Sequence, residues 1–449
     1  MTDKKAKLRH ILYLILLSTV LLGGCSIINQ EERQVSVGEM TNDLINFQAT
    51  LMQTHPMLQT ESLDAVKQDN ERVRLKNMQI KQEIIDDFAS LRQSLTKDTS
   101  PEDLVWALKK IVSKLGDEHT HVNMTTDQRT LPVRFKFTSD GLVTADDHAL
   151  IPKGSLVKKI NGKSVSDVLE VLKSVSPQGL DNVLYGGIIS NHLYTQNYLE
   201  HLGLLGPNDT VQLEFISGRG QETLSSLTLG RYKFPMEDNY AYHFDQASST
   251  GQFVIKNYMN VSEFEKVWAA FMDEYRVMQP QNLLIDVRQS VGGMDEYYIT
   301  DTILSAIGVD TYKTPYPGFY KEAYQQAETV VVTKHYDPIS VDNLYVAISN
   351  YTISAPTIFA ATVKENNLGT VIGQPVANNL DFYASGSYVF EHLPIQAGIS
   401  GFKLEYAGSE APTDHPLQPD ISLPLYAKHI QADIDPVIDW IEHGQVASD

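Results

Sequence analysis

The chain has 449 residues, and its 56 acidic and 36 basic side chains give a formal net charge of −20. So acidic a surface argues against nucleic acid as a partner and against electrostatic adhesion to anionic lipid. The length leaves room for two or three domains. The chain contains one cysteine, Cys25, which excludes an intrachain disulfide and leaves no cysteine nucleophile or cysteine-based metal site for the rest of the chain.

Residues 1–24 have the pattern of a signal peptide. Four basic residues precede an apolar run over residues 11–22, and two glycines lead to Cys25. The run is too short for a mature transmembrane helix, so we expect a secretory signal. The position of Cys25 resembles a bacterial lipobox, in which the cysteine is lipidated, and an ordinary signal with a chance cysteine is the alternative. We expect a lipid-anchored protein that faces outward from the cell membrane, most consistent with a Gram-positive surface, although a periplasmic lipoprotein also fits.

Residues 25–128 read as a helical N-terminal region. Ser100 followed by Pro101 and two acids is typical of a helix start, and leucine and isoleucine then recur at helical spacing over 104–115. Gly116 is expected to end this helix. Directly after it comes the stretch Asp-Glu-His-Thr-His at 117–121.

Residues 129–235 read as a small β-rich module. Apolar and polar residues alternate over 133–137 and again over 211–215, where a Gly-Arg-Gly turn leads to a second strand. Between these strands, residues 156–175 predict a strand, an Asn-Gly turn and a helix. This order resembles the peptide-binding module of the PDZ type, although no clear carboxylate-binding loop is present.

Residues 236–449 alternate strands and helices, which predicts an α/β domain with a substantially parallel sheet. Ser262 begins a capping-box pattern for a helix that runs to Val277, and residues 283–288 form a buried strand. The valines at 330–332 are expected to continue the alternation. Sites in such sheets form at the carboxyl ends of strands.

Ser354 lies between an apolar strand at 344–348 and a helix at 355–364, and a second strand follows at 370–373. A serine at this turn has backbone N–H donors and the positive end of the helix dipole beside it, which suits a nucleophile. The simpler alternative is that Ser354 caps the helix.

Two further segments are candidates for the same chemistry. Gly292 and Gly293 follow a buried strand, where their N–H groups suit an oxyanion hole, and a plain tight turn is the alternative. His119 suits a general base, although any one of 13 histidines is a weak signal. His121 lies two residues away on a loop, which is poor evidence for a metal site, and no metal is expected.

Taken together, these segments resemble the C-terminal-processing, or tail-specific, serine peptidase family, including its tricorn-like branch. The family's Gly-Asp-x-His-Thr stretch matches residues 116–120, and its Ile-Asp-Leu-Arg-x-x-Gly-Gly-Gly stretch matches 285–293, with Val291 in place of the first glycine. The family's Ser-Ala at a helix start matches Ser354 and Ala355. Its Gly-Glu-x-Thr stretch is matched loosely after Val371, and its Pro-Asp-Ile strand matches 419–421.

The resemblance implies a peptidase core of the ClpP/crotonase-like type, preceded by a PDZ-like module and a helical region. One branch of the family uses a lysine shortly after the serine, but no lysine occurs between Lys364 and Lys403. The tricorn-like branch uses a histidine, which makes His119 the base and Asp414 the nearest candidate for the acid. Gly292 or Gly293, together with Ala355, would then donate to the oxyanion. No metal or organic cofactor is implied, and the substrate would be a peptide or protein.

Two other functions remain open at this point. A catalytically inactive lipoprotein of this fold that binds peptides or a protein partner is favoured by Val291 and by Thr357, where family members often have glutamate. A solute-binding lipoprotein of a transporter would be expected to have two similar α/β lobes, and the sequence shows a single such block behind a helical front.

Overall fold

The structure is a computed structural model that describes residues 34–59, 71–234, 238–315, 318–320, 323–325, 329–334, 336–377, 380–404 and 416–444. The predicted signal peptide, Cys25 and Asp414 lie outside the described residues. Among the helices of the described ranges, none combines the length and the apolar character needed to cross a membrane.

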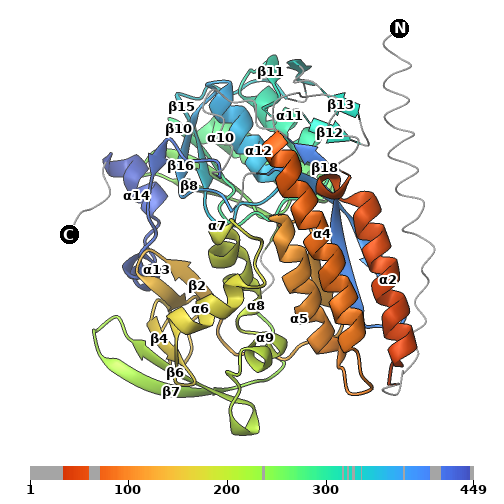
Figure 1. Ribbon diagram of the computed structural model, residues 1–449. Coiled ribbons are helices and arrows are strands. Elements are labelled where there is room, and N and C mark those ends of the chain that lie inside the picture. Colours follow the sequence, from red (N-terminus) through yellow and green to blue (C-terminus); the bar gives the residue numbers. More distant parts are fainter. Residues whose placement is uncertain are drawn as a thin grey trace.

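Three long helices form the N-terminal region and lie side by side (Figure 1). They are α2 (Val37–Thr54), α4 (Glu71–Ser94) and α5 (Pro101–Val112), with short turns η1 (Pro56–Leu58) and η2 (Ser113–Leu115). Their apolar faces pack against an antiparallel sheet in which β1 (His121–Met124) joins strands from the last third of the chain, namely β18 (Ile395–Leu404), β17 (Phe382–Val389), β12 (Gly318–Tyr320) and β13 (Ala323–Gln325). The first and last thirds of the chain therefore share one core.

The β-rich module has its own hydrophobic core and one antiparallel sheet. The strands are β2 (Phe135–Thr138), β3 (Gly141–Thr144), β4 (Leu156–Ile160), β5 (Lys163–Ser164), β6 (Thr210–Ile216) and β7 (Glu222–Thr228). The helical segments are α6 (Val165–Lys173), α7 (Asp181–Val183), a π-helical turn η3 (Leu184–Ile188), α8 (Ile189–His192), α9 (Gln196–His201) and η4 (Pro207–Asp209). The strand, Asn161-Gly162 turn and helix predicted at 156–175 are present, although the helix ends at Lys173.

The α/β core is built on a six-stranded sheet in the order β19-β16-β15-β10-β9-β8. Only the β8–β9 pair is antiparallel among these neighbours. The strands are β8 (Tyr240–Asp245), β9 (Thr250–Ile255), β10 (Asn282–Asp286), β15 (Asn343–Ile348), β16 (Thr370–Gly373) and β19 (Ile421–Ser422). The helices are α10 (Val261–Met278), α11 (Glu296–Ala306), α12 (Ala355–Glu365), α13 (Ala427–Ala432) and α14 (Pro436–His443).

The predicted α/β fold with N-terminal helices is confirmed, while the PDZ-like nature of the module and the domain boundaries stay predictions. Two local predictions are wrong. The cap of α10 is Asn260, whose left-handed backbone (φ 65°) an asparagine tolerates, and not Ser262. The valines at 330–332 fall in β14 (Thr329–Val331) and just after it, and β14 pairs with β11 (Thr311–Lys313) outside the parallel sheet.

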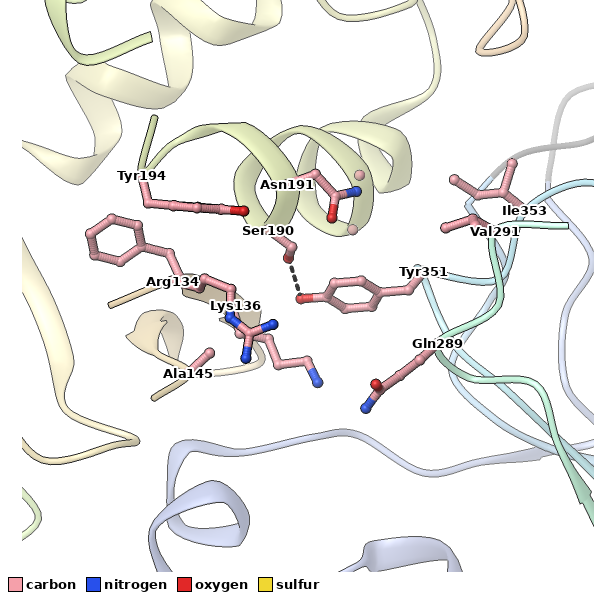
Figure 2. Close-up of a pocket in the computed structure, with 13 residues that line it drawn as sticks. Arg134, Lys136, Ala145, Ser190, Asn191, Tyr194, Gln289, Val291, Tyr351 and Ile353 are labelled. Carbon is pink, nitrogen blue, oxygen red and sulfur yellow. Dashed lines mark hydrogen bonds between the residues drawn. The ribbon is translucent and has the colours of Figure 1, made fainter. Parts of the chain in front are cut away.

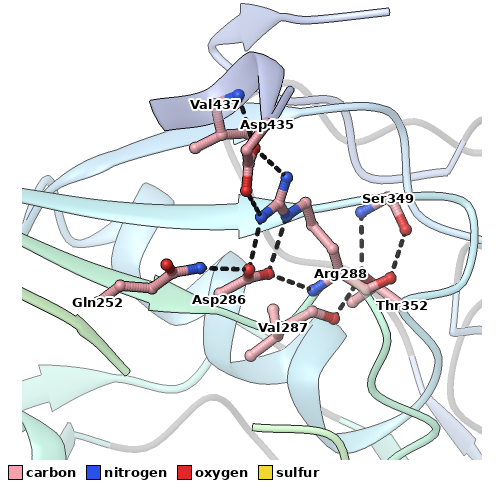
Figure 3. Close-up of polar contacts among 8 residues, drawn as sticks. All are labelled: Gln252, Asp286, Val287, Arg288, Ser349, Thr352, Asp435 and Val437. Carbon is pink, nitrogen blue, oxygen red and sulfur yellow. Dashed lines mark hydrogen bonds and ion pairs between the residues drawn. The ribbon is translucent and has the colours of Figure 1, made fainter. Parts of the chain in front are cut away.

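A partly buried arginine joins the carboxyl end of β10 to the C-terminal helix (Figure 3). Arg288 Nη2 lies 2.6 Å from both Asp286 Oδ2 and Asp435 Oδ2, and its Nε donates to Asp286 Oδ1 at 2.9 Å. Asp435 also accepts a hydrogen bond from the Val437 N–H at the start of α14. Burial acts to lower the pKa of Arg288, but the two carboxylates outweigh it and raise that pKa above its usual value. The guanidinium is therefore charged whenever the chain is folded.

We expect Arg288→Ala to lower the free energy of unfolding by about 3 kcal/mol, because two neighbouring carboxylates lose their common partner. Arg288→Lys should lose less, since it keeps the charge but not the two-sided geometry. Urea denaturation of both variants measures this. A loss of less than about 1 kcal/mol for the alanine variant, the value typical of an exposed ion pair, would contradict the prediction.

Candidate active site

Ser354 occupies the N-cap position of α12 in a strained backbone conformation. Its φ of 74° and ψ of −128° lie where residues with a side chain are rare, and such a conformation costs of the order of 1–3 kcal/mol. The side chain makes no capping hydrogen bond, so the alternative that Ser354 merely caps the helix is wrong. A buried serine held in strain without a capping role is typical of a functional turn between strand and helix.

The glycine loop after β10 lies directly against Ser354. A Cβ atom on Gly292 would stand 2.6 Å from the Ser354 Cβ and 3.1 Å from its Oγ, and one on Gly293 would stand 2.3 Å from the carbonyl oxygen of Tyr258. Only glycine fits at either position, and both have positive φ (90° and 152°). Val291, in place of the family's first glycine, points outward with 57% of its surface exposed, so this replacement does not crowd the loop.

Three backbone N–H groups near Ser354 are available as donors. Within the described part of the chain, no group accepts a hydrogen bond from the N–H of Gly292, Gly293 or Ala355. The Gly292 carbonyl accepts from the Tyr258 N–H at 2.8 Å, which holds the loop in place. These N–H groups are the predicted oxyanion donors, and the structure leaves them free for that task.

His119 follows the end of the N-terminal helices, where Gly116 takes a left-handed conformation (φ 61°) as expected. Its Nδ1 lies 2.6 Å from Glu118 Oε1, outside hydrogen-bond geometry. Its Nε2 is buried and has no hydrogen-bond partner among the described residues. The ring meets the edge of the Tyr383 ring at a centroid distance of 6.0 Å.

Asp117 holds the backbone of the loop that carries His119. Its Oδ1 accepts the His119 N–H at 2.9 Å, and its Oδ2 lies 3.1 Å from Nε2 of the fully buried His55. The Met57 N–H donates to Nδ1 of His55, so the imidazole proton is on Nε2 and points at Asp117. Burial acts to raise the pKa of Asp117, but the histidine outweighs it and lowers the pKa to about 2.

The charges around His119 favour its protonated form. Burial acts to lower the pKa of His119, but the carboxylates of Glu118 and Asp117 outweigh it and raise that pKa. Burial raises the pKa of Glu118 in turn. A neighbouring carboxylate that stabilises imidazolium is what a histidine base requires after it takes a proton.

Tyr383 and Glu296 connect His119 to the glycine loop. The Tyr383 hydroxyl donates to Glu296 Oε2 at 2.8 Å, and Glu296 begins α11 just after that loop. Ser354 Oγ and His119 Nε2 are not hydrogen-bonded to each other. The contacts from His119 to Tyr383 and from Tyr383 to Glu296 lead toward the glycine loop, and no hydrogen bond joins His119 to Ser354 in this structure.

Glu118 is the carboxylate beside the His119 imidazole in the described part of the chain. Asp414 lies outside the described residues, and the carboxylate that contacts His119 is Glu118, which sequence reasoning passed over although it lies inside the matched motif. Donor atoms of Asp117, Glu118 and His119 come within 4.8 Å of one another. Both oxygens of Asp117 already accept hydrogen bonds from protein groups, so this cluster is occupied by its own donors and suits a cation poorly.

Glu296 makes stability depend on pH. Burial raises its pKa from 4.5 to about 7, so the folded chain retains a proton that the unfolded chain releases. The folded state therefore loses stability as pH rises from about 4.5 through 7, by about 3 kcal/mol in total. We expect Glu296→Gln to gain stability relative to the parent chain between pH 5 and pH 8, measured by chemical denaturation at both values. The exposed Glu222→Gln is the control, and an unchanged difference for Glu296→Gln would contradict the prediction.

The segment that carries Ser354 is similar to a known peptidase family. The model of peptidase family S41 matches residues 256–385, the segment that carries Gly292, Gly293 and Ser354. Comparison with curated protein sequences finds no match. The structure of mature CPAF superposes with a TM-score of 0.65 at 14% identity, over 91% of this chain and 99% of that one.

Two other solved structures are similar. Mature CPAF complexed with lactacystin gives a TM-score of 0.64 at 13% identity, over 90% of this chain and 98% of that one. The photosystem II D1 C-terminal processing protease gives 0.45 at 12% identity, over 85% and 92%, which is too weak a likeness to argue from. The CPAF structures share the fold with this chain. The segment around Ser354 is similar to peptidase family S41, and the likeness to the CPAF structures is one of fold.

Proposed function

We propose that the chain is a serine peptidase in which Ser354 is the nucleophile and His119 the general base. One observation carries the proposal: Ser354 is held in a strained conformation at a helix start, without a capping bond, against a glycine loop with free N–H donors. A serine that only capped the start of a helix would not require this strained backbone conformation. In a peptidase, it aims Oγ away from its own backbone and toward a bound carbonyl.

The reaction is acyl transfer to water. His119 Nε2 takes the proton of Ser354 as Oγ attacks the peptide carbonyl, and the N–H groups of Gly292 or Gly293 and of Ala355 stabilise the oxyanion. His119 then protonates the leaving amine, and water releases the acyl group by the same steps. Because the Ser354–His119 hydrogen bond is not made in the free chain, a movement on substrate binding has to bring the two side chains together.

Among the described residues, Glu118 is the candidate for the acid that stabilises the charged imidazole, because its Oε1 lies 2.6 Å from Nδ1 and its carboxylate helps to raise the pKa of His119. Asp414, the sequence candidate, remains an alternative. The substrates are peptides or exported proteins at the cell surface, since the predicted lipobox would anchor the chain there through Cys25. The rival function, a catalytically inactive peptide-binding lipoprotein, rests on Thr357, whose buried hydroxyl has no partner among the described residues.

Labelling of purified residues 26–449 with a fluorophosphonate probe tests the nucleophile. We expect the parent chain to react, and Ser354→Ala and His119→Ala to lose labelling while they keep the fold by circular dichroism. The exposed Ser226→Ala on β7 is the matched control and should label normally. A folded parent chain that neither reacts nor cuts unfolded peptides would leave the inactive lipoprotein as the better function.

The pH profile tests Glu118. Its carboxylate helps to raise the pKa of His119, and the base must be neutral before it can accept a proton. Glu118→Gln should therefore shift the acid limb of the kcat/KM profile to lower pH. It should also lower kcat about tenfold or more, because the imidazolium loses its charge partner. If the acid limb stays in place, a residue outside the described ranges such as Asp414 orients His119.

A further inference from the structure

A cavity of about 310 Å³ lies between the β-rich module and the α/β core (Figure 2). Its volume is at the lower end of the roughly 300–1,000 Å³ typical of ligand sites. One wall comes from β2 and α8 with the turn before it, and the other comes from the loops after β10 and β15. The side chains that define its character are Arg134, Lys136, Ser190, Asn191, Gln289 and Tyr351.

The cavity adjoins the proposed reaction centre along the chain. Val291 and Ile353 both line it, and they directly precede Gly292 and Ser354. The Ile353 N–H donates to the Ser290 carbonyl at 3.0 Å, so the two loops run together past this wall. A peptide held at Ser354 would thus have a neighbouring side chain within reach of the cavity.

Two basic side chains line the cavity in a chain that is strongly acidic overall. Among the described residues its lining includes Arg134 and Lys136 and no aspartate or glutamate, whereas the chain has 56 acidic residues against 36 basic ones. Arg134 is held by Asp146, with Nη2 2.6 Å from Oδ1. The Lys136 ammonium lies 5.0 Å from the centre of the Tyr351 ring, and Figure 2 shows it directed toward the space beside Gln289.

Neutral donors complete the lining. The Ser190 hydroxyl donates to the Tyr351 hydroxyl at 2.8 Å, which fixes both groups across the two walls, and Asn191 and Gln289 also line the cavity. The walls are also held in register, because a Cβ atom on Gly186 would stand 1.7 Å from the Asn350 carbonyl oxygen. A preformed pocket lined by one lysine and the amides of Asn191 and Gln289 favours an anionic guest.

We propose that this cavity binds the side-chain carboxylate of an aspartate or glutamate next to the scissile bond, with Lys136 as its charge partner. The inference rests on the proposed peptidase function and adds the substrate class to it. Lys136 is a positioning and specificity residue here, since it contacts the substrate away from the reacting atoms.

Matched peptides test the proposal. Pairs that differ only by glutamate or glutamine at one position beside the scissile bond, with an amidated C-terminus, should show a preference for glutamate of about tenfold or more in kcat/KM. In Lys136→Gln the preference should fall to nearly one. In Lys136→Glu it should turn toward a lysine peptide. Lys158→Gln, an exposed lysine on β4 outside the cavity, is the control and should keep the parent preference.

A second series with free C-termini distinguishes a side-chain carboxylate from a terminal one. If only the free terminus restores the preference, the cavity binds a chain end and the proposal is overturned. Equal cleavage of glutamate and glutamine peptides overturns it as well, while the peptidase function stands.

If no peptide is cut, the proposed peptidase function fails. Measurements of peptide binding then still test whether the cavity binds a carboxylate. Fluorescence anisotropy with Ser354→Ala should then show tighter binding of the glutamate peptide than of its glutamine partner, with the difference lost in the Ser354→Ala, Lys136→Gln double variant. Equal affinities would overturn the proposal.

Discussion

The geometry of the site depends on Arg288, whose guanidinium forms ion pairs with two carboxylates. Its side chain holds Asp286 and Asp435, while its backbone carbonyl accepts a hydrogen bond from the Ser349 hydroxyl. The preceding carbonyl, of Val287, accepts from the Thr352 hydroxyl at 2.9 Å. The loops after β10 and β15 are therefore joined side chain to backbone just before each reaches its reactive residue (Figure 3). The parallel strands β10 and β15 end side by side. These hydrogen bonds keep the two loops that follow aligned as far as Gly292 and Ser354.

The ion pairs of Arg288 stabilise the fold, whereas unpartnered polar atoms and a strained backbone near Ser354 lower its stability. Buried polar atoms without a hydrogen-bond partner among the described residues gather near the glycine loop and the serine helix, including Asn257 Oδ1, Tyr258 Oη, Ser290 Oγ and Thr357 Oγ1. Each such atom costs of the order of 1–3 kcal/mol, and native chains carry few of them. Their concentration beside a strained Ser354 is the pattern expected where function, and not packing, has set the residue types.

Sequence reasoning located Ser354 and the glycines because strand, turn and helix leave a local pattern of a few residues. It also identified His119, through a motif and not through periodicity. Glu118 lies in that motif, but the side chain of a loop residue can point in any direction. The sequence therefore contains no pattern that predicts its contact with the His119 imidazole. Tyr383 and Glu296 are 87 residues apart, and no local pattern reports their hydrogen bond. The cap of α10 was misplaced for a simpler reason, since Ser262 and Asn260 both suit a cap and only the backbone decides between them.

The hydrogen bonds of Asp43 give the chain a fixed order of assembly. This residue of α2 accepts the N–H groups of His392 and Leu393, about 350 positions further along. The strand that follows His119 pairs with β18, about 275 positions further along. The loop that carries the histidine thus gains its native neighbours only when the last quarter of the chain has been made, and contacts of such long range form late and slowly. In the proposed peptidase, a partly synthesised chain would have neither His119 nor Ser354 in its native position, so these long-range contacts would keep an unfinished molecule inactive.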